Sequence, residues 1–224
     1  LEYLVQDLYN LAVHYGKGKK VNLIGHSWGG MLASAFIASH ADMVDKLVLA
    51  EPGPLTPGMA ADYNAEMQLE PSWELMIHLG KCYFKSLHVE EIDEQARGDF
   101  FFQAFAMDTS VSNHPLAAYF CNGDITRLNP VHWRYSGTTS YQIMFKGMQD
   151  AENKMNIGEG SEVFTNKILM LTGACNKLVG PDFQEEQMKL FYDIEMVVIP
   201  EAGHFMFSEQ PELCIKAVKA YFSG

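Results

Sequence analysis

Four short apolar runs, rich in β-branched residues, are spaced along the chain and predict the strands of a sheet. They are Lys20–Ile24, Asp45–Ala50, Lys167–Thr172 and Ile194–Ile199. Helical windows flank these runs, at Leu1–Tyr15, Met31–His40, Pro181–Tyr192 and Gln210–Phe222. Strands that alternate with helices through short connections are typical of parallel crossover units. The pattern therefore predicts an α/β fold in which helices flank a mostly parallel sheet.

The long stretch between the second and third predicted strands has a different pattern. From Leu55 to Glu162 strand signals are few, and helical windows dominate at residues 72–87, 89–108 and 115–122, with many aromatic residues and methionines. Helices inserted between two strands of one sheet are expected to cover a pocket beside it. We therefore expect a core made of residues 1–54 and 163–224 and a helical cap made of residues 55–162.

The first predicted strand runs directly into Gly25-His26-Ser27-Trp28-Gly29, and a helical window follows. Strand, G-x-S-x-G and helix in this order describe a nucleophile elbow, in which a sharp turn lifts the serine hydroxyl above the sheet. The flanking glycines are expected to remove side chains that would clash in the turn. Ser27 is the predicted nucleophile. The Trp28 N–H, close to a helix N-terminus, is the predicted oxyanion donor.

The run Gly-His-Ser-Trp-Gly-Gly-Met-Leu-Ala resembles the elbow of α/β-hydrolases, and more narrowly that of the proline iminopeptidase-like branch. This resemblance implies an α/β-hydrolase fold and a serine aminopeptidase that releases an N-terminal residue, proline in the nearest branch. A carboxylesterase on small acyl substrates and a non-catalytic binding protein are the alternatives, because fold does not fix substrate. An aminopeptidase has to hold a substrate ammonium, and acidic residues of the predicted cap could do so: Glu66, Glu70, Glu74, Glu90, Glu91 and Glu94.

A serine nucleophile needs a base, and eight histidines are present. Most of them fall at predicted helix ends, in the predicted cap or, for His26, inside the elbow turn, where structural roles are expected. His204 is different, since it follows the last predicted strand and a Pro-Glu-Ala-Gly turn. Its surroundings, Ile199 to Pro211, resemble the histidine loop that precedes the last α/β-hydrolase helix. His204 is therefore the predicted general base and acid.

The acid that orients the histidine is less simple to place. In the family it commonly stands three residues after the glycine that ends the penultimate strand, and Asn176 stands there in this chain. Asparagine carries no charge to stabilise an imidazolium. Glu51 directly follows the strand expected beside the elbow strand, and it resembles the acid of haloalkane dehalogenase-like hydrolases in this placement. We predict Glu51 as the acid, with Asn176 and Asp182 as alternatives, although Asp182 also suits a helix N-terminus.

Composition limits the partners. The net charge of −12 argues against a nucleic-acid partner. No apolar run reaches the roughly 18 residues of a bilayer span, so a soluble protein without a membrane partner is expected. No metal or organic cofactor is implied, and the substrate is expected to be a small molecule or a short peptide. The four cysteines form no C-x-x-C pair and are predicted to be buried thiols. Without a disulfide pattern, a cytoplasmic location is favoured.

A second oxyanion donor usually comes from a loop after an earlier strand. Nothing before residue 20 could hold that strand, and by the resemblance the helix at Leu1–Tyr15 is the one that precedes the elbow strand. Several N-terminal strands of the hydrolase fold are therefore expected to be missing from this chain. If the chain is truly short, the elbow strand becomes an exposed edge that would pair with a second copy.

Overall fold

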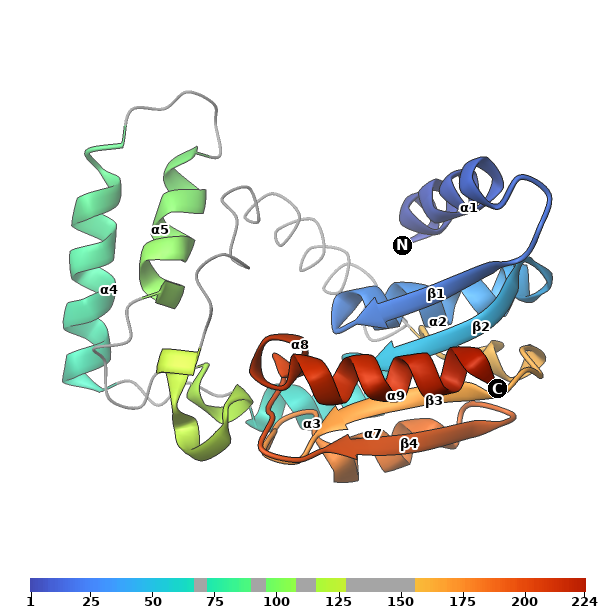
Figure 1. The fold of residues 1–224 in the computed structure, drawn as a ribbon. Helices are drawn as coiled ribbons and strands as arrows, with labels where there is room; N and C mark the ends of the chain where they lie inside the picture. Colours follow the sequence, from blue (N-terminus) through green and yellow to red (C-terminus); the bar gives the residue numbers. More distant parts are fainter. Residues whose placement is uncertain (67–71, 90–95, 108–115, 128–155) are drawn as a thin grey trace.

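The computed structural model describes residues 1–66, 72–89, 96–107, 116–127 and 156–224. Its centre is a four-stranded parallel sheet in the order β1-β2-β3-β4 (Figure 1). The strands are β1 Val21–His26, β2 Val44–Ala50, β3 Ile168–Gly173 and β4 Ile194–Ile199. Each lies within two residues of its predicted bounds. The predicted α/β class, the parallel sheet and the position of β2 beside the elbow strand are confirmed.

Alternate residues of the central strands point to opposite faces of the sheet, and helices cover both faces. One face carries Leu47, Leu49, Ile168 and Met170, which pack against α1 Glu2–Gly16, α2 Trp28–His40 and the end of α7 Pro181–Met188. The other face carries Val48, Ala50, Leu169 and Leu171, which pack against α8 Met206–Glu209 and α9 Pro211–Ser223. Burial on both faces explains why β2 and β3 read as continuous apolar runs.

The chain between β2 and β3 contains three longer helices: α3 Pro57–Glu66, α4 Trp73–Ser86 and α5 Ala96–Met107. α4 and α5 pack against each other and stand away from the sheet (Figure 1). The helix predicted at residues 115–122 is wrong. Two short 3-10 turns, η2 Ala117–Tyr119 and η3 Cys121–Gly123, take its place, because Asn122 and Gly123 adopt left-handed backbone angles (φ 56° and 69°) that end a helix. The division into core and cap stays a prediction.

Shorter elements complete the described fold: η1 Ala41–Met43, η4 Ile125–Arg127 and η6 Ser161–Val163. Among the residues that the structure describes, no helix combines the length and the apolar character that a transmembrane span requires.

The prediction of four free thiols is wrong for two of the cysteines. Cys121 of η3 and Cys175, just after β3, form a disulfide with a Cα–Cα distance of 4.7 Å. The partners are 54 residues apart in sequence, so their spacing gave no sign that the fold would bring them together. Cys82 and Cys214 are free and buried, as predicted. The favoured cytoplasmic location rested on the lack of a disulfide pattern and loses that support.

Candidate active site

Ser27 lies at the turn between β1 and α2, in a backbone conformation that non-glycine residues rarely adopt (φ 55°, ψ −119°). Its N–H donates to Ala50 O at 3.0 Å, and its carbonyl accepts from Gly30 N at 2.9 Å. These bonds hold the strained serine between the tip of β2 and the first turn of α2. Strain of this kind persists only where surrounding contacts fix it, and it is common at functional sites.

The glycines of the elbow do not all act as the sequence suggested. A Cβ on Gly25 would lie 2.4 Å from Gly29 O, so Gly25 has to be glycine for the helix to approach the strand. A Cβ on Gly29 would meet nothing within 4 Å outside its own helix, so the expected clash at this position is wrong. The second tight position is Gly30, whose Cβ would lie 3.0 Å from Pro52 Cβ.

Trp28 is the first residue of α2. The first N–H groups of a helix have no acceptor within the helix and lie at the positive end of its dipole. The Trp28 N–H is therefore suited to stabilise negative charge that develops next to Ser27.

Glu51 follows the last residue of β2 and is completely buried, with a left-handed backbone (φ 43°). Four donors surround its carboxylate. Oε1 accepts from Gly173 N at 2.7 Å and from Thr172 Oγ1 at 2.9 Å. Oε2 accepts from Asn176 Nδ2 at 2.7 Å and from His204 Nδ1 at 2.8 Å. Because every contact is a donor that suits a charged carboxylate, the site is built for an anion at this position.

His204 is nearly buried, and its backbone is fixed on both sides of the peptide unit. Its N–H donates to Tyr119 O at 2.7 Å, and its carbonyl accepts from His26 Nε2 at 2.7 Å. The Nδ1–H bond to Glu51 selects the tautomer in which Nε2 carries a free lone pair. The imidazole is thereby prepared to accept a proton through Nε2.

The contact between His26 and His204 brings the elbow against the histidine loop, since His26 directly precedes Ser27. The two imidazole rings lie 4.8 Å apart between centroids, and the Tyr119 ring lies 4.7 Å from that of His204. Burial, with a smaller contribution from His204, lowers the pKa of His26 to about 4. Within the described part of the chain, no hydrogen bond joins Ser27 Oγ to His204.

The two alternative acids are placed differently. Asn176 does not contact His204 through a hydrogen bond; it donates to Glu51, and its Oδ1 accepts from Leu178 N at 3.0 Å and Val179 N at 3.3 Å. Asn176 therefore orients the carboxylate of Glu51. Asp182 is exposed in the first turn of α7 and has no bond to His204 among the described contacts.

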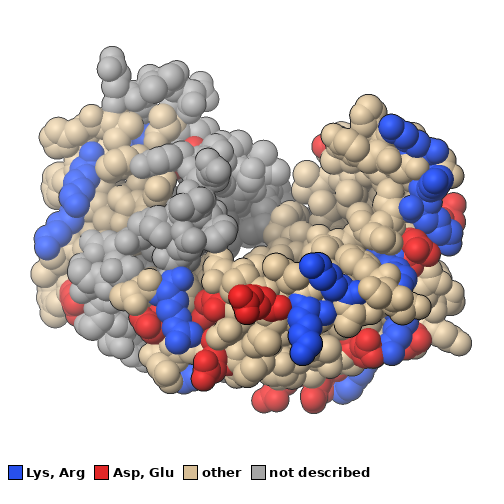
Figure 2. Space-filling model, in the orientation of Figure 1, with Lys and Arg blue, Asp and Glu red and all other residues tan. Residues whose placement is uncertain are grey.

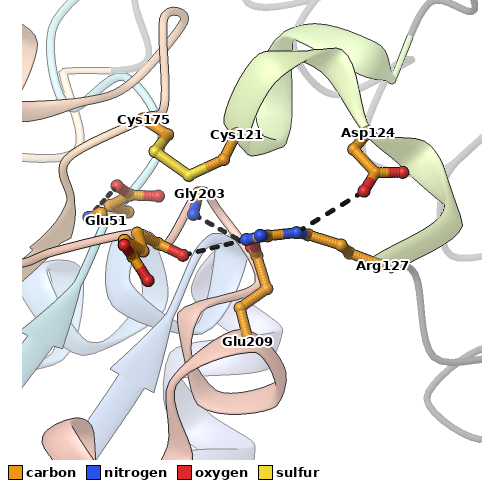
Figure 3. The surroundings of a disulfide bond; sticks show 9 residues. Glu51, Cys121, Asp124, Arg127, Cys175, Gly203 and Glu209 are labelled. Carbon is orange, nitrogen blue, oxygen red and sulfur yellow. Dashed lines mark hydrogen bonds and ion pairs between the residues drawn. A yellow bond between two sulfur atoms is a disulfide. The ribbon is translucent and has the colours of Figure 1, made fainter.

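Sequence reasoning missed a second buried carboxylate behind the histidine loop. Figure 3 shows Glu209 between Gly203 and Arg127, beside the disulfide. Its Oε1 accepts from Gly203 N at 3.0 Å, and Oε2 lies 3.6 Å from Arg127 Nη1, which also donates to Glu201 O. Burial raises the pKa of Glu209. In the sequence Glu209 resembles any surface acid of a short helix, so only the fold reveals it.

A model of the family described as "Alpha/beta hydrolase family" matches residues 1–217. This chain belongs to that family. An sn-1-specific diacylglycerol lipase of Mus musculus, ABHD11, is 25% identical over 99% of this chain and 65% of its own length. A distant proline iminopeptidase-like homologue of Mycoplasma genitalium is 24% identical over 83% of this chain and 63% of its own length. The chain thus spans slightly less than two thirds of these relatives.

Solved structures agree on the fold. A bromoperoxidase from Bacillus anthracis superimposes with a TM-score of 0.60 at 14% identity, covering 98% of this chain and 73% of its own. A thermophilic esterase from Thermogutta terrifontis gives a TM-score of 0.53 at 18% identity, covering 98% and 70%. At these identities the likeness shows an α/β-hydrolase fold and leaves the reaction to be argued from the site.

Proposed function

We propose that this chain is a serine hydrolase that cleaves an ester or amide bond through an acyl-enzyme, with Ser27 as nucleophile, His204 as general base and Glu51 as acid. The contact that carries the proposal is the 2.8 Å bond from His204 Nδ1 to the buried Oε2 of Glu51. A charge buried this deeply is costly unless it is used or fully paired. At Glu51 it faces the one histidine loop that also contacts the serine elbow.

In the proposed reaction, Ser27 Oγ attacks the substrate carbonyl carbon while His204 Nε2 accepts the hydroxyl proton. The imidazolium that forms is stabilised by the Glu51 carboxylate, and the Trp28 N–H donates to the oxyanion. The tetrahedral intermediate breaks the bond to the leaving group, which takes the proton from His204. Water then attacks the acyl-enzyme with His204 again as base, and this step releases the acid and restores Ser27.

Residues 55–162 are proposed to act as the cap that limits access to Ser27. η2 supports this role, because its Tyr119 contacts His204 through both its carbonyl and its ring. The Tyr119 hydroxyl also hydrogen-bonds that of Tyr63 in α3. Polar groups of the segment therefore reach the side of His204 where a substrate would enter.

An ester is the favoured substrate class, since two curated relatives are named diacylglycerol lipases and an esterase shares the fold. Aminopeptidase activity is the second candidate and is supported by the iminopeptidase-like homologue. Of the acidic residues expected to hold an ammonium, Glu66 and Glu74 are exposed. The other four, Glu70, Glu90, Glu91 and Glu94, lie outside the described residues.

The test is turnover of nitrophenyl acyl esters beside turnover of proline naphthylamide, each with the wild type and with Ser27→Ala. The proposal predicts hydrolysis of at least one class and loss of it in Ser27→Ala by a factor of roughly 10³ or more. Hydrolysis that persists in Ser27→Ala would refute the assignment of the nucleophile.

A further inference from the structure

Helix α4 carries a large apolar surface that nothing in the structure covers. Along Trp73–Ser86 and the residue after it, six bulky apolar side chains are exposed, from Trp73 at 86% to Leu87 at 45%. They are Trp73, Met76, Ile77, Tyr83, Phe84 and Leu87. Their spacing follows i, i+3, i+4, which places them on one face of the helix. Isolated exposed apolar residues are ordinary, but a continuous stripe marks an interaction surface.

This stripe is separate from the face by which α4 belongs to the fold. The buried face consists of Leu75, His78, Cys82 and Ser86, and α4 packs against α5. At about 100° per residue, the buried face and the exposed stripe lie on opposite sides of the helix. α4 therefore has one apolar face more than its own packing needs.

The polar residues of α4 indicate what covers the stripe. Lys81 and Lys85 are exposed on one border of it, together with Glu74 near the start of the helix. Figure 2 shows basic side chains along the outer edge of α4, on a protein whose net charge is −12. Aromatic and long aliphatic residues on one side, with lysines beside them, are the composition of a helix that lies in the interface of a lipid bilayer.

We propose that α4 docks its exposed stripe onto a lipid surface, with Lys81 and Lys85 at the level of the headgroups. Trp73 and Tyr83 have the amphipathic rings that prefer this level, while Ile77 and Phe84 enter the acyl boundary. The sequence argued only against a span of the bilayer, and a helix that lies on the surface needs no span. Contact with a second copy is the competing explanation, and there the lysines would gain no opposite charge.

The experiment measures partition of the full chain, as Ser27→Ala to prevent turnover of lipid, between buffer and phosphatidylcholine vesicles with or without phosphatidylserine. Ile77→Glu with Phe84→Glu should weaken binding by roughly a hundredfold, since each buried apolar side chain contributes about tenfold. The matched control, Tyr192→Glu with Ile215→Glu, adds the same charge at equally exposed apolar sites elsewhere and should bind like the parent.

A second pair of variants tests the headgroup contact. Lys81→Gln with Lys85→Gln should weaken binding to phosphatidylserine vesicles by roughly fivefold per lysine and leave binding to phosphatidylcholine vesicles unchanged. Absence of vesicle binding by the parent, or equal loss in the control variant, overturns the proposal. So does a concentration-dependent dimer that Phe84→Glu dissociates while vesicles stay unbound. Binding is measured without catalysis, so failure here is distinguishable from failure of the proposed hydrolase activity.

Discussion

Replacement of Glu51 by glutamine is the most informative single change, because the side chain keeps its size while losing its charge. The two donors at each carboxylate oxygen leave no place for the new NH₂ group. On the Oε1 side it would face Gly173 N–H, which can only donate. On the Oε2 side it would face Asn176, whose amide cannot flip without losing the two bonds that its Oδ1 accepts.

Glu51→Gln should therefore affect stability and turnover together. A buried donor left without an acceptor costs about 1–3 kcal/mol of the free energy of unfolding. Loss of the charged acid of a serine–histidine–acid triad lowers kcat by about 10⁴, or about 5.5 kcal/mol in activation free energy. Stability should fall modestly, whereas catalysis should nearly disappear.

The assay is urea unfolding beside ester turnover for Glu51→Gln, with Asp182→Asn as the control that removes the alternative acid. Turnover by Asp182→Asn should stay within a factor of about two of the wild type, as expected for an exposed surface residue. If Glu51→Gln folds and retains turnover within tenfold of the wild type, the reasoning on the acid is refuted.

Three further outcomes follow from the described contacts. Replacing Cys121 and Cys175 by serine should lower the free energy of unfolding by about 4 kcal/mol, from the entropy of a 54-residue loop, and a thiol reductant should act on the wild type alone; equal sensitivity of both proteins in a denaturation curve would contradict this. Gly25→Ala should destabilise the elbow strongly and abolish turnover, while Gly29→Ala, where a Cβ has space, should express and unfold like the wild type. Because the pKa of His26 is about 4 in the fold and 6.5 in the unfolded chain, the unfolded state takes up a proton first as pH falls. Stability should then drop by up to about 3 kcal/mol between these two values, and His26→Asn should lack this part of the slope in chemical denaturation at stepped pH.

Much of the core could be predicted because its signals are local. The strands are short apolar runs with clear ends, and Gly25 and Ser27 stand directly between a strand and a helix, so the elbow followed from residues adjacent in sequence. Glu51 could be proposed as the acid because the tips of neighbouring parallel strands share one edge of the sheet.

The missed features depend on contacts between distant segments. The disulfide joins residues 54 positions apart, and the bond from Glu209 to Gly203 requires the fold of the histidine loop. Nor does the spacing G-x-S-x-G reveal that Gly30, rather than Gly29, packs against Pro52. Sequence periodicity describes an element and its faces, but not which partner each face meets.

The central claim is that Ser27 is a nucleophile activated by His204. The most direct measurement is mass spectrometry of the chain after exposure to a fluorophosphonate probe, with His204→Ala and Ser27→Ala beside the wild type. The account predicts one adduct on the peptide that contains Ser27 in the wild type and little or none in either variant. An unmodified Ser27 in folded wild-type protein, or an adduct that forms equally well in His204→Ala, would contradict it.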